Sequence, residues 1–144
     1  MGVSTNAILI FGIDYEEGEL PLMNDEDDSD FEKIVAEAYG VKEPEVEYSD
    51  ETTEEYRKYW AKQREVMNQI PVVMETHCSD SCPMYILGLS KTRVSANRGD
   101  PATFDRGALE TEITDRDIEL FKEFYEKFNI EWQEPKWLLC SYWG

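Results

Sequence analysis

The stretch PVVMETHCSDSCPMYILGLSKTRVSA, residues 71–96, decides the fold that the sequence predicts. Two β-rich segments, PVVMETHC and MYILGLSKTRVSA, flank SDSCP, whose small and polar residues are typical of a turn. Strands that are joined by so short a connection pair in opposite directions. We therefore predict an antiparallel hairpin with strands at residues 71–78 and 84–96.

Helices are predicted on both sides of this hairpin, and each begins at a capping box, a Ser or Thr followed three residues later by an acid. The boxes are Ser29 with Glu32, Thr52 with Glu55, and Thr114 with Asp117. After each box, apolar residues recur at spacings of three and four, which is the period of a helix with one buried face. The pattern predicts helices at residues 30–39, 53–70 and 115–129.

The two ends of the chain add strands to the hairpin. NAILIFGID near the start and PKWLLCSYWG at the end predict strands at residues 6–13 and 136–142. The resulting order of elements predicts an α+β fold with about three helices on one face of a mixed, mostly antiparallel sheet of about four strands. We expect one domain over residues 1–144, with Trp60, Phe121 and Phe124 in its core.

The negative charge is concentrated in one part of the chain. The 144 residues hold 32 acids and 14 bases, for a net charge of −18. Residues 14–55 hold 18 of these acids and only Lys33 and Lys42 as bases, so this third of the chain alone carries −16. We expect an acidic, loop-rich excursion at about residues 14–55. Direct binding of nucleic acid is not expected, because such proteins neutralise phosphates with Lys and Arg.

The remaining composition predicts a soluble, cytoplasmic protein with free thiols. No apolar run approaches the roughly 20 residues that cross a bilayer, and the N-terminus lacks the basic flank of a signal peptide. We therefore expect no membrane partner. The three cysteines are an odd number, which does not suggest a disulfide framework.

The segment METHCSDSCPMY, residues 74–85, holds the single histidine and two of the three cysteines. In a strand, His77 and Cys78 point to opposite faces, and structural zinc sites usually combine two C-x2–4-C pairs, whereas this chain has a single C-x3-C. We expect no metal and no cofactor. Cys78 and Cys140 are instead expected to be small buried hydrophobic residues on facing strands.

A Cys–His nucleophilic site is the alternative for the same segment. Cys82 could approach His77, with Asp80 or Glu75 orienting the imidazole. A strongly negative protein raises the pKa of a thiol, however, and so disfavours the reactive thiolate.

Three islands of sequence carry a resemblance. AILIFGID, HCSDSCPMYIL and WLLCSYWG are similar to segments of small acidic proteins from actinobacteria and their phages. This resemblance implies a phage-type accessory protein, and it assigns no catalytic role to any residue.

Three kinds of function remain open. The first is a non-catalytic interaction protein that binds a basic host protein, such as a nucleic-acid-binding factor, by imitating the charge of nucleic acid. The second is a small Cys–His or metal-dependent enzyme centred on His77, Cys78 and Cys82. The third is a scaffold or oligomeric protein that uses exposed aromatics of its last strand, and the sequence leaves the oligomeric state open.

We favour the interaction protein, although an acidic surface that only maintains solubility is also consistent with the charge. The expected partner-binding residues are Asp25, Glu26, Asp27, Asp28, Asp30, Glu43, Glu45, Glu47, Asp50 and Glu51.

Overall fold

The computed structural model describes residues 5–20, 22 and 31–143, and the chain divides into two compact units. The sheet unit comprises residues 1–21 and 71–144, and the helical unit comprises residues 22–70. The acidic stretch at 14–55 is thus divided between the two units. The expectation of one domain stays a prediction.

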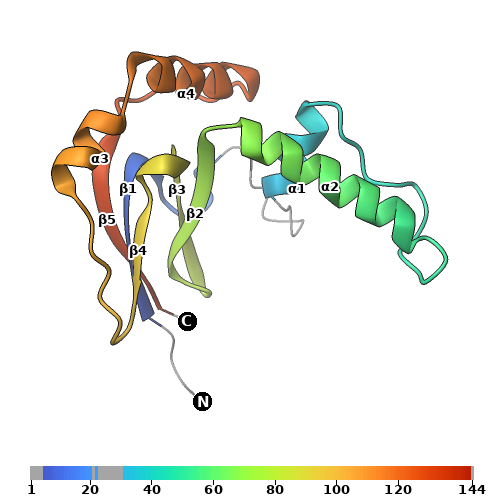
Figure 1. The fold of residues 1–144 in the computed structure, drawn as a ribbon, viewed down its shortest axis with the longest axis horizontal. Helices are drawn as coiled ribbons and strands as arrows, with labels where there is room; N and C mark the ends of the chain where they lie inside the picture. The colour runs from blue at the N-terminus through green and yellow to red at the C-terminus, as the bar shows by residue number, and fades with distance from the viewer. Residues whose placement is uncertain (1–4, 21, 23–30, 144) are drawn as a thin grey trace. The chain divides into compact units, whose positions relative to one another are not determined.

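Among its described residues, the sheet unit contains five strands and two α-helices (Figure 1). In chain order its elements are β1 (Thr5–Tyr15), β2 (Val72–Ser79), β3 (Cys82–Leu89), a 3-10 turn (Ser90–Thr92), β4 (Val94–Asn97), α3 (Arg106–Glu112), α4 (Asp115–Lys127) and β5 (Lys136–Trp143). The helical unit contains α1 (Phe31–Ala38) and α2 (Thr53–Gln69). The predicted α+β class is confirmed. None of the helices in the described part of the chain is long and apolar enough to cross a membrane.

The sheet is mixed and mostly antiparallel, as predicted, with the strand order β3-β2-β5-β1-β4. The predicted hairpin is present as β2 and β3, and the parallel pairing joins β2 to β5. Because β3 also pairs with β1, the strands β1, β3, β2 and β5 complete a circuit. The buried residues Ile8, Ile10 and Ile86 pack together on one face of these strands, with Val73, Leu138 and Cys140 against them.

Two facing glycines lie where the pairing of β1 changes along the strand, from β4 to β3. The first half of β1 pairs with β4, and its last residues pair with β3, where Gly12 lies opposite Gly88. A Cβ atom at Gly12 would lie 2.4 Å from the carbonyl oxygen of Leu87 and 2.7 Å from the Cα of Gly88. Only glycine permits the two backbones to approach so closely.

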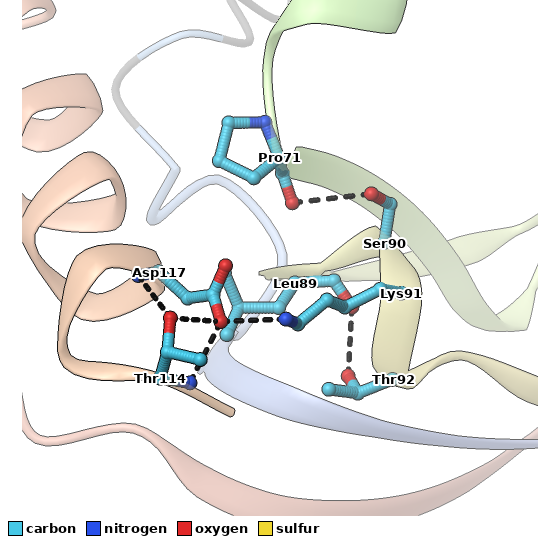
Figure 2. Close-up of polar contacts among 7 residues, drawn as sticks. All are labelled: Pro71, Leu89, Ser90, Lys91, Thr92, Thr114 and Asp117. Atoms are coloured by element: carbon cyan, nitrogen blue, oxygen red, sulfur yellow. Dashed lines mark hydrogen bonds and ion pairs between the residues drawn. The ribbon is translucent and has the colours of Figure 1, made fainter. Parts of the chain in front are cut away.

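The predicted strand at 84–96 is wrong in one respect, because the 3-10 turn divides it into β3 and β4. Thr92 stabilises this turn, since its buried hydroxyl donates to the carbonyl of Leu89 at 2.7 Å and accepts from the backbone N–H of Phe11 at 3.0 Å. The Ser90 hydroxyl donates a hydrogen bond to the carbonyl oxygen of Pro71 at 3.2 Å (Figure 2). The turn thus connects the entry of β2, the end of β3 and the middle of β1.

The predicted capping box at α4 is confirmed, and it carries an ion pair (Figure 2). The Thr114 hydroxyl accepts from the N–H of Asp117 at 3.2 Å, and the Asp117 carboxylate accepts from the N–H of Thr114 at 2.7 Å. Lys91 of the 3-10 turn lies 2.6 Å from the same carboxylate. Phe121 and Phe124 are buried, as predicted.

In the helical unit, α1 buries Phe31, Val35 and Ala36, and α2 buries Tyr56, Tyr59 and Gln63. The first of the predicted capping boxes lies partly outside the described residues, because Ser29 is not among them. The second is wrong: the Thr52 side chain makes no cap hydrogen bond to α2. Its hydroxyl donates instead to the carbonyl of Glu47 at 2.8 Å. This hydrogen bond holds the irregular segment that precedes α2.

Candidate interaction surface

The irregular segment before α2 is held against the first turns of that helix. The hydroxyl of Tyr56 donates to the carbonyl of Val46 at 2.9 Å, and the Thr52 hydroxyl donates to the carbonyl of Glu47. The ring of Tyr48 lies 5.3 Å from the ring of Tyr56, edge to face, and 5.8 Å from the ring of Trp60. Aromatic pairs at such distances are favourable beyond the area that they bury. The segment therefore has a defined conformation although it is neither helix nor strand.

Large apolar side chains on this segment and on α2 remain open to solvent. Tyr48 is 58% exposed and Trp60 is 42% exposed. The prediction that Trp60 is buried is wrong, because the buried side of α2 is formed by Tyr56, Tyr59 and Gln63, and Trp60 lies beside it. Contacts with Tyr48 and Tyr56 hold the exposed indole in place.

Five of the ten predicted partner-binding residues belong to the described part of the chain. Asp25, Glu26, Asp27, Asp28 and Asp30 lie outside it. Glu43, Glu45, Glu47, Asp50 and Glu51 are all exposed, as a binding role requires. Glu43 forms an ion pair with Lys33, and its hydrogen bond raises the pKa of that lysine. The other four form no ion pair with any residue that the structure describes.

We name these features the acidic–aromatic surface, defined as Glu45, Glu47, Tyr48, Asp50, Glu51 and Trp60. Outside this surface the charge changes sign along α2, where Arg57, Lys58, Lys62 and Arg64 are exposed. Arg57 lies 3.8 Å from Glu54, at the boundary between the two signs. The strongly acidic stretch at residues 14–55 is thus followed in the sequence by exposed cations in the middle of α2.

The sequence predicted these carboxylates but missed their aromatic neighbours. Tyr48 lies in an irregular segment without apolar periodicity, so no pattern marked it. Tyr56 and Trp60 are four residues apart and therefore share one side of a helix. That spacing was the available signal for an aromatic cluster.

The hairpin turn between β2 and β3 holds the other predicted candidates. The thiol of Cys82 donates to a carboxylate oxygen of Glu17 at 3.3 Å. This hydrogen bond, followed by the charge of Glu17, raises the pKa of Cys82. The Nε2 atom of His77 is buried and has no hydrogen-bond partner among the described residues. Desolvation lowers the pKa of His77, against the charge of Asp14.

The structure does not assemble the Cys–His pair that the sequence allowed. The described partner of Cys82 is Glu17, which disfavours the thiolate that nucleophilic attack needs. In the part of the chain that the structure describes, no three His, Cys, Asp or Glu side chains are grouped so that they could hold a metal ion. Cys78 and Cys140 lie on neighbouring strands, as predicted, but both are half-buried rather than buried.

Strand β5 presents a second apolar feature. Trp137, Leu139 and Trp143 are exposed on one side of this strand. Beside them, a groove of about 290 Å³ is lined by Leu9, Phe104, Arg106, Leu109, Glu110 and Trp137. The scaffold hypothesis expected exposed aromatics here, although β5 lies inside the sheet and not at its edge.

Comparisons with protein-family models, curated proteins and solved structures find no match for this chain.

Proposed function

We propose that the protein is a non-catalytic interaction protein whose acidic–aromatic surface binds a basic partner protein. The observation that carries the proposal is the combination at residues 45–60. Four exposed carboxylates without an ion pair in the described structure lie in the same short segment as Tyr48, whose exposed ring contacts that of Trp60.

Each component has a physical role in binding. Unpaired carboxylates attract a basic partner over several ångströms and speed its association. Tyr and Trp are enriched among the residues that contribute most to binding energy at interfaces. Their ring faces also attract the guanidinium and ammonium groups of Arg and Lys. The segment is held by Tyr56 and Thr52, so little ordering is needed on binding.

The aromatic residues distinguish this proposal from an acidic surface that serves solubility alone. Solubility is served by carboxylates and is reduced by exposed apolar side chains. A partner-binding surface explains both the charge and the exposed rings of Tyr48 and Trp60.

The partner that this chemistry fits is a protein with clustered Arg and Lys. A nucleic-acid-binding factor of a host cell is one such protein, and imitation of nucleic-acid charge is the form of inhibition that we propose for a phage-type accessory protein. The resemblance of the three sequence islands supports that accessory role.

The first experiment captures partners from a host-cell lysate with the full chain at low and at high salt. The Debye length shortens from about 10 Å at 0.1 M to about 3 Å at 1 M, so capture of a basic protein should weaken sharply. The captured protein is then purified and titrated against the parent chain and against a Tyr48→Ala, Trp60→Ala variant. Equal affinity of parent and variant for that protein at both salt concentrations would contradict the proposal.

A further inference from the structure

The outer face of β5 is apolar and open to solvent. Side chains alternate along a strand, and Leu138 and Cys140 on the other face of β5 pack against the core. The outward residues are Trp137, Leu139, Ser141 and Trp143, all of them exposed. Monomeric proteins seldom leave a contiguous group of large apolar side chains uncovered.

The adjacent strand β1 extends this face. In the register of the two strands, Phe11 lies beside Trp137, Leu9 beside Leu139, Ala7 beside Ser141 and Thr5 beside Trp143. Residues that are paired across two strands share a face of the sheet. We name these four pairs the β5 face. No charged residue is among them, although the chain carries a net charge of −18.

We propose that the β5 face binds the β5 face of a second copy of this chain, which gives a dimer with two-fold symmetry. The inference goes beyond the proposed function, because this face lies in the sheet unit and the acidic–aromatic surface lies in the helical unit. The contact is between the faces of two sheets, since β5 already pairs with β1 on one side and with β2 on the other.

The order of side chains along the β5 face makes it complementary to itself. In a two-fold dimer both copies use the same patch, so two different positions meet reciprocally. An axis that crosses β5 at Cys140 sets this strand antiparallel to its counterpart and stacks residue 139 over residue 141. The pair of Leu139 and Leu9 then stands over the pair of Ser141 and Ala7. Large side chains of each copy thus meet small side chains of the other.

The tryptophans lie at the two ends of the same arrangement. Trp137 of one copy lies over Trp143 of the other, and the symmetry repeats this contact at the opposite end. The ring of Trp137 is supported from its own sheet by the ring of Phe11, at a centroid distance of 5.4 Å. Because tryptophan is enriched among the residues that contribute most to binding energy, both ends can anchor the dimer.

The exposed apolar area is of the size that a dimer needs. Trp137, Leu139 and Trp143 are 37%, 76% and 61% exposed, and Phe104, which lines the groove beside Trp137, is 52% exposed. With about 200–250 Å² for a whole aromatic residue and somewhat less for leucine, they expose roughly 450 Å². A stable interface buries about 800 Å² per partner, of which about 65% is apolar in homodimers. These residues therefore supply most of the apolar area required.

Salt should strengthen this dimer. Each copy carries a net charge of −18, so two copies repel each other through water, and salt screens that repulsion. The β5 face itself has no charged residue whose attraction salt could weaken. Association of two copies through the acidic–aromatic surface and the cations of α2 would weaken with salt instead. The direction of the salt effect therefore distinguishes the two modes of self-association.

The test measures the mass of the purified full chain by sedimentation equilibrium over a range of concentrations. The proposal expects the mass to rise from 16.8 kDa towards twice that value and to stop there, because a two-fold dimer is closed. The dissociation constant should fall several-fold between about 0.1 M and about 1 M salt. A chain that stays monomeric at every concentration, or a dimer that weakens with salt, would overturn the proposal.

Leu139→Lys places a charge in the middle of the β5 face and should raise the dissociation constant at least about tenfold. Val46→Lys is the matched control, at a position of the helical unit that is 43% exposed. Each substitution changes the net charge from −18 to −17, so general repulsion affects both variants alike. Equal dimerisation of the two variants would count against the β5 face as the interface.

Ser141→Phe tests the self-complementary packing independently. The substitution makes the face more apolar, but it fills the space over which Leu139 of the second copy stands. Non-specific hydrophobic association would become stronger, whereas the proposed dimer should weaken several-fold. Far-UV circular dichroism of all three variants should match that of the parent, because Val46, Leu139 and Ser141 are exposed. A tighter dimer in Ser141→Phe would overturn the proposal.

Discussion

The hydroxyl groups of Tyr15 on β1 and Tyr125 on α4 form a buried hydrogen bond of 2.5 Å. The two residues are 110 positions apart in the sequence. Desolvation is the main cause that raises the pKa of both phenols, so the pair stays protonated over the ordinary pH range. The bond is a polar contact between the first strand and the longer helix of the sheet unit.

Removal of one hydroxyl should be more harmful than removal of both. In Tyr15→Phe or Tyr125→Phe, the remaining buried hydroxyl loses its partner, which costs about 1–3 kcal/mol in the free energy of unfolding. The double variant leaves no unpaired hydroxyl and should be close to the parent. Urea unfolding of all four proteins measures this cycle. Additive losses in the double variant would show that the hydrogen bond is not the cause.

Truncation of two aromatic residues should destabilise the protein to different degrees. Phe121 is 0% exposed, so Phe121→Ala should destabilise the sheet unit by about 3–5 kcal/mol. Trp60 is 42% exposed, and its aromatic contacts contribute about 0.5–1.5 kcal/mol each, so Trp60→Ala should cost much less. Denaturant unfolding compares the two variants. A larger loss for Trp60→Ala would contradict the placement of these side chains.

The close approach of β1 and β3 predicts that Gly12 does not tolerate a side chain. A Cβ at this position would meet backbone atoms that cannot rotate away, so Gly12→Ala should cost at least about 1–3 kcal/mol. Gly107→Ala is a matched control in α3, where an added Cβ would lie 3.4 Å from the Asp105 side chain and alanine is the better helix former. Thermal unfolding should show a loss for the first variant and no loss for the second.

The Lys91–Asp117 pair predicts a pH dependence. Burial acts to raise the pKa of Asp117, but hydrogen bonds from Lys91 and Thr114 outweigh it, and the pKa lies below its ordinary value. A group with a lowered pKa in the folded protein stabilises it above the unfolded pKa, about 3.9 for Asp. The stability difference between the parent and Asp117→Asn should therefore be constant above about pH 5 and shrink as the pH falls below 4. A difference that grows on acidification would contradict this sign.

The elements that the sequence predicted correctly are those with a strong local signal. The capping box at Thr114 and the apolar spacing of Phe121 and Phe124 located α4, and the turn composition of SDSCP located the hairpin. These signals work because capping and periodicity involve residues that are close in the chain.

The missed features are a short helix, a contact between distant residues and one unusual backbone conformation. The sequence analysis predicts no helix at the residues of α3, which is short and contains Gly107, although the Asp105 side chain caps it. The break between β3 and β4 depends on Thr92, whose hydroxyl binds the backbone of Phe11, 81 residues away. The left-handed conformation of Cys78 has no counterpart in the composition of the strand.

The candidate surface was predicted only in part. Its carboxylates follow from composition, but the exposure of Trp60 depends on which side of α2 is buried, and an amphipathic pattern with several aromatics does not specify that side. Tyr48 joins the surface only because Tyr56 and Thr52 hold its segment against α2.

Charge reversal of the acidic–aromatic surface tests the central claim most directly. The test variant carries Glu45→Lys, Glu47→Lys, Asp50→Lys and Glu51→Lys. The control carries Glu112→Lys, Glu126→Lys, Glu131→Lys and Glu134→Lys, at exposed positions of the sheet unit. Each set changes four charges from −1 to +1, so both variants move the net charge from −18 to −10.

The measurement is the affinity of each purified chain for the captured basic partner at about 0.1 M salt. We predict that the test variant loses binding, that the control retains most of it, and that both keep nearly the thermal stability of the parent, because exposed charges contribute little to folding. Equal affinity of the test and control variants would show that the interaction follows net charge alone, and it would contradict a binding site at the acidic–aromatic surface.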